Sequence, residues 1–166
     1  HLDRALRANT DNLRARNLRS LVLRARGRVE EAQAALEEIL RIDPLDIWAR
    51  AQRGDAPGSD PQIGLDVALD YAQAGFYAEA IAYLARCRPA ADSGAVPLVQ
   101  YCLGWLWTKL GDARRALACY TAGAAAPTDY CFPARLEEIA ILEAAMAANP
   151  TDARAPYYLG NLLYDR

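Results

Sequence analysis

Apolar residues recur along most of the chain at intervals of three and four positions, which is the spacing of one face of an α-helix. This pattern predicts three helix pairs, a short helical piece and two further helices. Their expected ranges are 13–26/28–42, 62–74/77–88 and 97–110/112–125 for the pairs, 45–53 for the short piece, and 133–148 and 153–164 for the last two. We therefore expect an all-α fold.

The three predicted pairs share one register, which is centred on Gly27, Gly75 and Gly111. An alanine stands five positions after each glycine, and a large apolar residue stands four positions before it and nine positions after it. The glycine allows a tight turn between antiparallel helices, while small residues let the helices approach closely. In this register we expect Gly104 to face Ala116. One such unit cannot bury its apolar stripe alone, so the register predicts stacked helix pairs.

The segment YCLGWLWTKLGDARRALACYTAG, residues 101–123, carries a Leu-Gly pair, an aromatic residue, a turn Gly-Asp, an alanine and a tyrosine in the order of a tetratricopeptide repeat (TPR). Over most of its length the chain resembles this family. The resemblance implies an α-solenoid, a right-handed superhelix of antiparallel helix pairs. Departures from the family period imply irregular insertions.

The resemblance predicts a single TPR-like helical domain over residues 1–166, as a segment of a longer array. Its expected parts are the end of a preceding repeat at 1–12, repeats at 13–46, 61–94 and 97–130, an insertion at 47–60, and an irregular, truncated repeat at 131–166. Because both ends fall within a repeat, we expect the cut ends to associate, for example in a homodimer.

The last third, PTDYCFPARLEEIAILEAAMAANPTDARAPYYLGNLLYD, resembles the C-terminal TPR tail of large bacterial multidomain proteins that also carry a β-rich, carbohydrate-enzyme-like portion. The helix predicted near 133–148 has the sequence pattern of the second helix of a repeat. No segment with the pattern of a first helix precedes it. We favour a linker at 126–132 that crosses the helix layer, anchored by Tyr130, Cys131 and Phe132. The alternative is an ordinary antiparallel hairpin with the helix at 112–125.

Two tryptophans lie two positions apart and therefore do not share a helix face. In the TPR register Trp107 packs between the two helices of its repeat, whereas Trp105 points into the concave groove. Carried over repeat by repeat, the groove candidates include Asn17, Arg24, Tyr101, Trp105, Lys109, Arg154, Tyr157, Asn161 and Tyr164, with Leu65, Leu69 and Gln73 in the middle repeat. The alternative, that a neighbouring helix covers Tyr101 and Trp105, stays open.

The net charge of −2 is unevenly distributed, because residues 1–28 hold eight arginines against two aspartates, a net of +6. No aromatic residue is interleaved with these arginines for base stacking, so we expect no nucleic-acid partner. No apolar run approaches the roughly 18 residues of a membrane helix, so we expect no membrane partner either.

Candidate chemistry is sparse. The four cysteines lie 15, 17 and 12 positions apart and the only histidine is His1, which suits neither a zinc site nor a disulfide framework. We expect reduced, mostly buried thiols, no metal, no cofactor and a cytoplasmic protein. Adjacent carboxylates such as Glu137 and Glu138 diverge on a helix and should lie on solvated faces, so we expect no positioned acid–base group and no enzymatic activity.

These observations predict a non-catalytic protein–protein interaction module that binds a peptide or protein segment on its concave groove, since aromatic and arginine side chains dominate interface hot spots. The alternative is a structural helical arm that packs against a catalytic, carbohydrate-enzyme-like portion of the same polypeptide.

Overall fold

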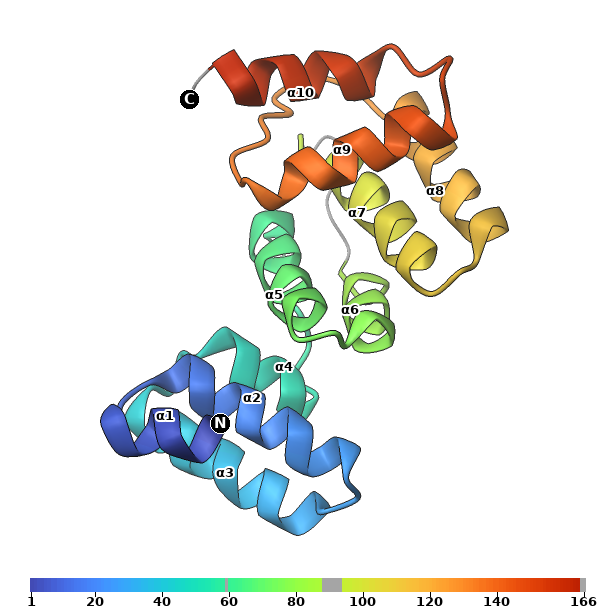
Figure 1. The fold of residues 1–166 in the computed structure, drawn as a ribbon. Helices are drawn as coiled ribbons and strands as arrows, with labels where there is room; N and C mark the ends of the chain where they lie inside the picture. The colour runs from blue at the N-terminus through green and yellow to red at the C-terminus, as the bar shows by residue number, and fades with distance from the viewer. Residues whose placement is uncertain (59, 88–93, 165–166) are drawn as a thin grey trace. The chain divides into compact units, whose positions relative to one another are not determined.

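The computed structural model describes residues 1–58, 60–87 and 94–164. Within these ranges it contains ten α-helices and no strand (Figure 1), which confirms the predicted all-α fold. The predicted helices are all present, with ends that differ by a few residues. No helix among the described residues is both long and apolar enough to cross a bilayer.

The chain divides into two compact units, His1–Ala56 and Pro57–Arg166, where the sequence predicted one domain. The boundary falls inside the predicted insertion at 47–60. Helix α4 (Ile47–Arg53) ends there at Gly54, whose φ of 103° is a conformation that favours glycine. The sequence Ala-Pro-Gly then follows at 56–58, and its proline cannot continue a helix.

The first unit is a helix pair flanked by two short helices. Helices α2 (Leu13–Ala25) and α3 (Val29–Ile42) pack against each other, α1 (Leu2–Ala8) packs on α2, and α4 packs on both α2 and α3. Leu36 and Ile39 of α3 form a core with Ala49 of α4. The piece expected near 45–53 is therefore an integral part of this unit.

A partly buried polar network ties α4 to α2. The Asn17 amide donates to the Asp46 carboxylate at 3.2 Å, and the Gln52 amide donates to Asn17 Oδ1 at 2.8 Å. Asp46 also caps α4, because its Oδ1 accepts from the Ala49 N–H at 2.7 Å. Asn17 is only 1% exposed, so it serves this network and is not open to a groove ligand as the sequence suggested.

The second unit contains three helix hairpins. They pair α5 (Pro61–Gln73) with α6 (Tyr77–Leu84), α7 (Val96–Lys109) with α8 (Ala113–Ala125), and α9 (Glu137–Ala148) with α10 (Arg154–Tyr164). Helix α7 is central, since it also packs against α5, α6 and α9. Helix α6 ends at Leu84, before the predicted end at 88, and residue 88 itself lies outside the described residues.

Two glycine–tyrosine pairs lock α7 to α8. A Cβ placed on Gly104 would lie 2.5 Å from the ring of Tyr120, and one placed on Gly123 would lie 3.0 Å from the ring of Tyr101. Gly104 is thus a close helix–helix contact as predicted, but its nearest neighbour is Tyr120 and not Ala116. The tyrosine ring fills the space that the glycine leaves open, one turn beyond the alanine.

Trp107 is less buried than its predicted core position implied. Its side chain is half-buried, and the Arg115 guanidinium carbon lies 4.5 Å from the centroid of its ring. The cation on α8 covers the part of the indole that the helix pair leaves exposed.

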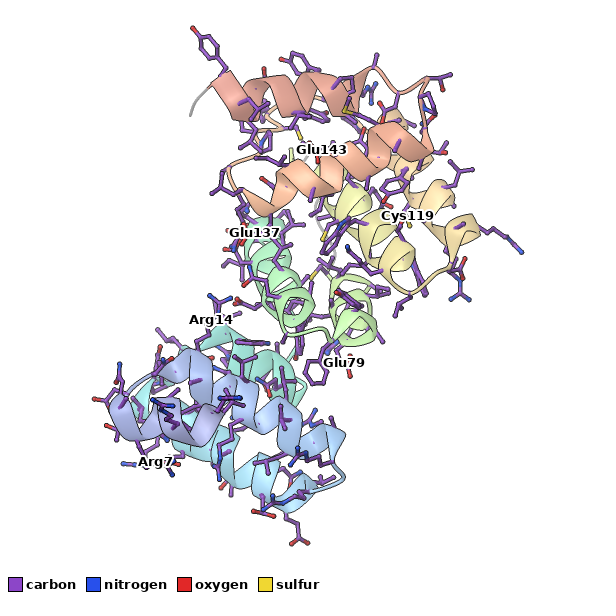
Figure 2. All side chains as sticks on the ribbon, in the orientation of Figure 1. Arg7, Arg14, Glu79, Cys119, Glu137 and Glu143 are labelled. Carbon is purple, nitrogen blue, oxygen red and sulfur yellow. The ribbon has the colours of Figure 1, made fainter. Side chains whose placement is uncertain are left out.

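Segment 126–136 carries the chain from α8 towards α5. Arg135, just before α9, pairs with Asp66 of α5 at 2.6 Å, and Gln73 of α5 donates to Glu137 at 2.6 Å. Glu137, labelled in Figure 2, is the first residue of α9. The hairpin alternative for α8 and α9 is therefore wrong, because α9 packs mainly on α7 and α10 and lies across α7 in Figure 1.

Candidate interaction site

Exposed aromatic side chains gather where segment 126–136 meets α10. Tyr130 is 82% exposed, Phe132 is 71% exposed and Tyr157 is 59% exposed. They border an open hollow of about 480 Å³. Its full lining is Thr128, Asp129, Tyr130, Cys131, Phe132, Ala153, Arg154 and Tyr157.

The segment wall of the hollow owes its shape to an alternation of side chains. Tyr130 and Phe132 are exposed, whereas Cys131 and Pro133 between and after them are buried. The two inward residues anchor the segment, whereas the two outward aromatic side chains face solvent. The expectation that Tyr130 and Phe132 anchor the segment is therefore wrong, because both side chains are exposed.

The backbone at Tyr130 is held in an unusual conformation. Its φ of 58° lies in the left-handed region, which is uncommon for a residue other than glycine. Its carbonyl lies directly against Gly94, where a Cβ would collide with the Tyr130 backbone. The absence of a side chain at position 94 therefore lets the segment settle next to the start of α7.

The other wall is the first turn of α10, which Asp152 holds in place. Asp152 Oδ1 accepts from the Arg154 N–H at 2.8 Å and caps the helix, while Oδ2 accepts from the Tyr101 hydroxyl at 2.8 Å. Burial, and then the Asp152 carboxylate, hold the pKa of Tyr101 well above its usual range, so the phenol stays a donor. The Arg154 guanidinium donates to the Ala126 carbonyl, which joins α10 to the end of α8.

Of the predicted site residues, only Arg154 and Tyr157 line this hollow. Asn161 is half-buried and Tyr164 is 93% exposed, both farther along α10. Arg24 is exposed and Asn17 is buried, and both belong to the first unit. The predicted residues are therefore not brought together on one surface of the second unit.

Trp105 and Lys109 form a separate cluster on α7. Lys109 Nζ lies 5.0 Å from the centroid of the Trp105 ring, and Tyr77 of α6 meets that ring edge-on at 6.3 Å between centroids. Trp105 is thus half-buried between Lys109 of the same helix and Tyr77 of α6. Less of its indole ring is exposed than in the open groove that the sequence predicted.

Tyr101 is fully buried, so its assignment to an open groove needs correction. Its ring contacts Gly123 on one side and Tyr158 on another, at 6.2 Å between ring centroids, while its hydroxyl binds Asp152. The alternative that a neighbouring helix covers this position is the one the structure supports. Leu65 and Leu69, the corresponding residues of α5, are buried as well.

A buried carboxyl group holds the start of α9. Glu138 Oε2 accepts from the backbone N–H groups of Ala134 and Arg135 at 2.7 and 2.8 Å, while Oε1 has no hydrogen-bond partner among the described residues. Burial raises the pKa of Glu138, against the opposing effect of these two N–H groups. The predicted solvated face is therefore wrong for Glu138, which is buried and binds the backbone of the residues just before α9.

The cysteine thiols offer no activated nucleophile. All four are free, and three are buried, while Cys119 on α8 is half-buried (Figure 2). Burial raises the pKa of every one, to about 12 for Cys102 and about 11 for Cys131. A thiol that stays protonated at neutral pH attacks poorly. Across the described ranges, no group of three or more histidine, cysteine, aspartate or glutamate residues is placed to hold a metal ion.

Comparison of the chain with protein-family models, with curated proteins and with solved structures gives no match. The hollow is lined by aromatic faces, an arginine and backbone groups around an open space. Such residues are enriched where proteins bind other proteins.

Proposed function

We propose that the chain is a non-catalytic, TPR-like interaction module that binds a peptide or protein segment. The observation that carries this proposal is the exposed aromatic cluster of Tyr130, Phe132 and Tyr157 around a hollow of about 480 Å³, a volume within the range of ligand sites. Three large exposed aromatic side chains bordering one hollow are more than the scattered apolar residues of an ordinary surface.

The TPR-like arrangement rests on the packing order of the second unit. Helix α7 contacts both helices of the preceding pair, α5 and α6, and then pairs with α8. Stacking of this kind, repeated in the register of Gly75 and Gly111, is what a helical repeat array requires. The turn glycines have φ values of 82° and 79°, as equivalent turns should.

Each wall of the hollow has a distinct role in the proposed binding. Phe132 and Tyr157 would enclose an apolar or aromatic side chain of the bound segment. Arg154 donates one guanidinium N–H to the Ala126 carbonyl, and a guanidinium has five such donors. Its remaining donors would take a carbonyl or carboxylate of the segment. The proposed ligand is therefore an extended peptide with a large apolar residue next to an acceptor.

Peptide selection on the full chain tests this proposal. Peptides enriched from a random display library should bind the wild type, and the double variant Phe132→Ala/Tyr157→Ala should weaken them by tenfold or more, about 1.4 kcal/mol. Leu117→Ala is the matched control, since Leu117 is an exposed apolar residue of α8 outside the hollow. Enriched peptides that bind the double variant and the wild type equally would contradict the proposed site.

A structural helical arm is the second candidate function, and the outer face of α10 favours it. Leu163 and Tyr164 are 54% and 93% exposed on a helix whose opposite face is buried. Such a face suits packing against a neighbouring portion of the polypeptide, which the resemblance to bacterial multidomain tails would make carbohydrate-active. If library selection yields no peptide at the hollow, this second function is the better supported one.

A further inference from the structure

Helices α7 and α10 share a sequence register that extends over eight residues. YCLGWLWT at 101–108 aligns with YYLGNLLY at 157–164, which matches Tyr101 with Tyr157 and Gly104 with Gly160. The inner faces correspond too, because Cys102 and Leu106 of α7 and their counterparts Tyr158 and Leu162 of α10 are all buried. The two helices therefore present equivalent outer faces.

In α7 the outer face receives α8. The Tyr120 ring fills the space at Gly104, and its hydroxyl lies 3.1 Å from Thr108 Oγ1. Three residues farther along α8, Gly123 leaves room for the Tyr101 ring. A tyrosine and a glycine on one helix thus fit a glycine and a tyrosine on the other, in reversed order.

In α10 the equivalent face is bare. A Cβ on Gly160 would meet no atom within 4 Å, whereas one on Gly104 would collide with a ring. Tyr157 and Leu163 are more than half exposed, and Tyr164 is almost fully exposed. The positions that seat α8 on α7 are the same positions that α10 leaves uncovered.

We propose that this face of α10 docks an amphipathic α-helix of a partner protein, antiparallel to α10 and patterned like α8. The docked helix carries a large aromatic residue that rests on Gly160 and, three positions later, a glycine or alanine that faces Tyr157. Leu163 stands where α7 has Trp107, so the contact there is apolar. This inference rests on the equivalence of α7 and α10 and does not depend on peptide binding in the hollow, although the two proposed sites share Tyr157.

A helical peptide of the chain's own α8 sequence is the probe for this site. The peptide covers residues 112–126 with Cys119→Ser, and a staple joins positions 114 and 118, both exposed on α8. The staple is needed because an isolated helix shorter than about 12–15 residues is marginal in water. A matched control peptide carries Tyr120→Ala and Gly123→Val, which remove the two features that fit α10.

Fluorescence anisotropy of the labelled peptide with the full chain gives the affinity. We expect Gly160→Leu to weaken binding by about tenfold or more, because the leucine occupies the space for the aromatic ring. The open surroundings of Gly160 should let this variant fold, and Leu163→Ser provides a second variant with the same expected direction. Leu117→Ala, on α8 and outside both the hollow and this face of α10, should leave the affinity unchanged, and the control peptide should not bind.

Three outcomes would overturn the proposal. The first is no binding of the stapled peptide to the wild type. The second is equal binding to the wild type, Gly160→Leu and Leu163→Ser chains, which would place the peptide elsewhere, for instance in exchange with α8. The third is self-association of the wild type in analytical ultracentrifugation that Gly160→Leu abolishes, which would make a second copy of the chain the occupant.

Discussion

Gly104 and Gly160 occupy the same place in the repeat register but face opposite surroundings. At Gly104 the neighbouring helix is so close that a methyl group would lie 2.5 Å from the Tyr120 ring, and at Gly160 a methyl group would meet nothing within 4 Å. The packing environment, and not the residue type, therefore decides what a side chain at each position does to stability.

This contrast gives a matched pair of substitutions in one unit. Gly104→Ala should lower the free energy of unfolding by about 1–3 kcal/mol, because the ring or the helix must shift. Gly160→Ala should raise it by up to about 1 kcal/mol, because alanine favours the helix and has room. Urea unfolding followed by circular dichroism measures both, and equal effects of the two substitutions would contradict the assigned contact.

Glu138 is a second residue whose surroundings set its behaviour. Burial raises its pKa above the usual 4.5, so the folded protein binds its proton more tightly than the unfolded chain does. The stability that this protonation contributes is fully present below the unfolded pKa and is lost as the pH rises through the folded pKa.

The Glu138→Gln variant tests this linkage. Its side-chain oxygen can still accept the Ala134 and Arg135 N–H groups, but it does not titrate. The free energy of unfolding of the wild type, relative to the variant, should therefore increase as the pH falls from 7.5 towards 4.5. Denaturant unfolding of both proteins across this range gives the difference, in which other titrating groups cancel. A difference that is constant with pH would show that Glu138 is solvated.

At the residue scale, the sequence predicted which positions lie at a helix contact, but it did not predict which side chains a distant segment buries. The register placed Gly104 at a helix contact, yet it could not show that Tyr101 and Asn17 are buried. Tyr101 is covered by Asp152 and Tyr158, which lie more than fifty positions away. A pattern along one helix contains no information about which distant segment packs on it.

At the scale of elements, the helices followed from periodicity and from the turn glycines. Two helices are shorter than expected, because α6 ends at Leu84 and not at 88, and α9 begins at Glu137 and not near 133. Pro133 is buried and the N–H groups of Ala134 and Arg135 bind a side chain, so these residues belong to the incoming segment. Residues 130–133 are Tyr-Cys-Phe-Pro, so the sequence has no apolar–polar alternation there that could have marked the two aromatic residues as exposed.

Two helix caps in the first unit differ in the number of helices that the capping side chain contacts. Asn12 caps α2 by accepting from the Ala15 N–H at 3.0 Å. Asp46 caps α4 and also accepts from Asn17 of α2, so its carboxylate joins two helices. Loss of the Asp46 carboxylate therefore removes both a helix cap and a partly buried tertiary hydrogen bond.

We expect Asn12→Ala to cost about 1 kcal/mol, the usual value for a cap. Asp46→Ala should lower the free energy of unfolding by about 2–3 kcal/mol, because the Asn17 amide also loses its hydrogen bond to the Asp46 carboxylate. Asp46→Asn keeps an oxygen for the cap and should fall between the two. Urea unfolding of the three variants gives the ranking, and a cost for Asp46→Ala no larger than that for Asn12→Ala would contradict the network.

At the scale of the whole molecule, the chain forms two units that differ in what can stabilise them. The unit at His1–Ala56 is small, and a domain of about 60 residues buries a smaller share of its surface on folding than a larger domain does. The unit at Pro57–Arg166 contains three helix hairpins and the fully buried Tyr101, Tyr120 and Tyr158. Its core is therefore the larger source of stability. The sequence pattern, which predicted one continuous array, did not indicate this difference.

This difference predicts that residues 57–166 fold without residues 1–56. The fragment should give a helical circular-dichroism spectrum and a cooperative urea transition, because its core residues all come from within it. Gly104→Ala should lower its free energy of unfolding by the same amount as in the full chain, since Gly104 and Tyr120 both lie in the fragment. The reciprocal fragment, residues 1–56, should be marginal in the same buffer. A non-cooperative transition for 57–166, or an effect of Gly104→Ala that differs between fragment and full chain, would show that the first unit contributes to the core of the second.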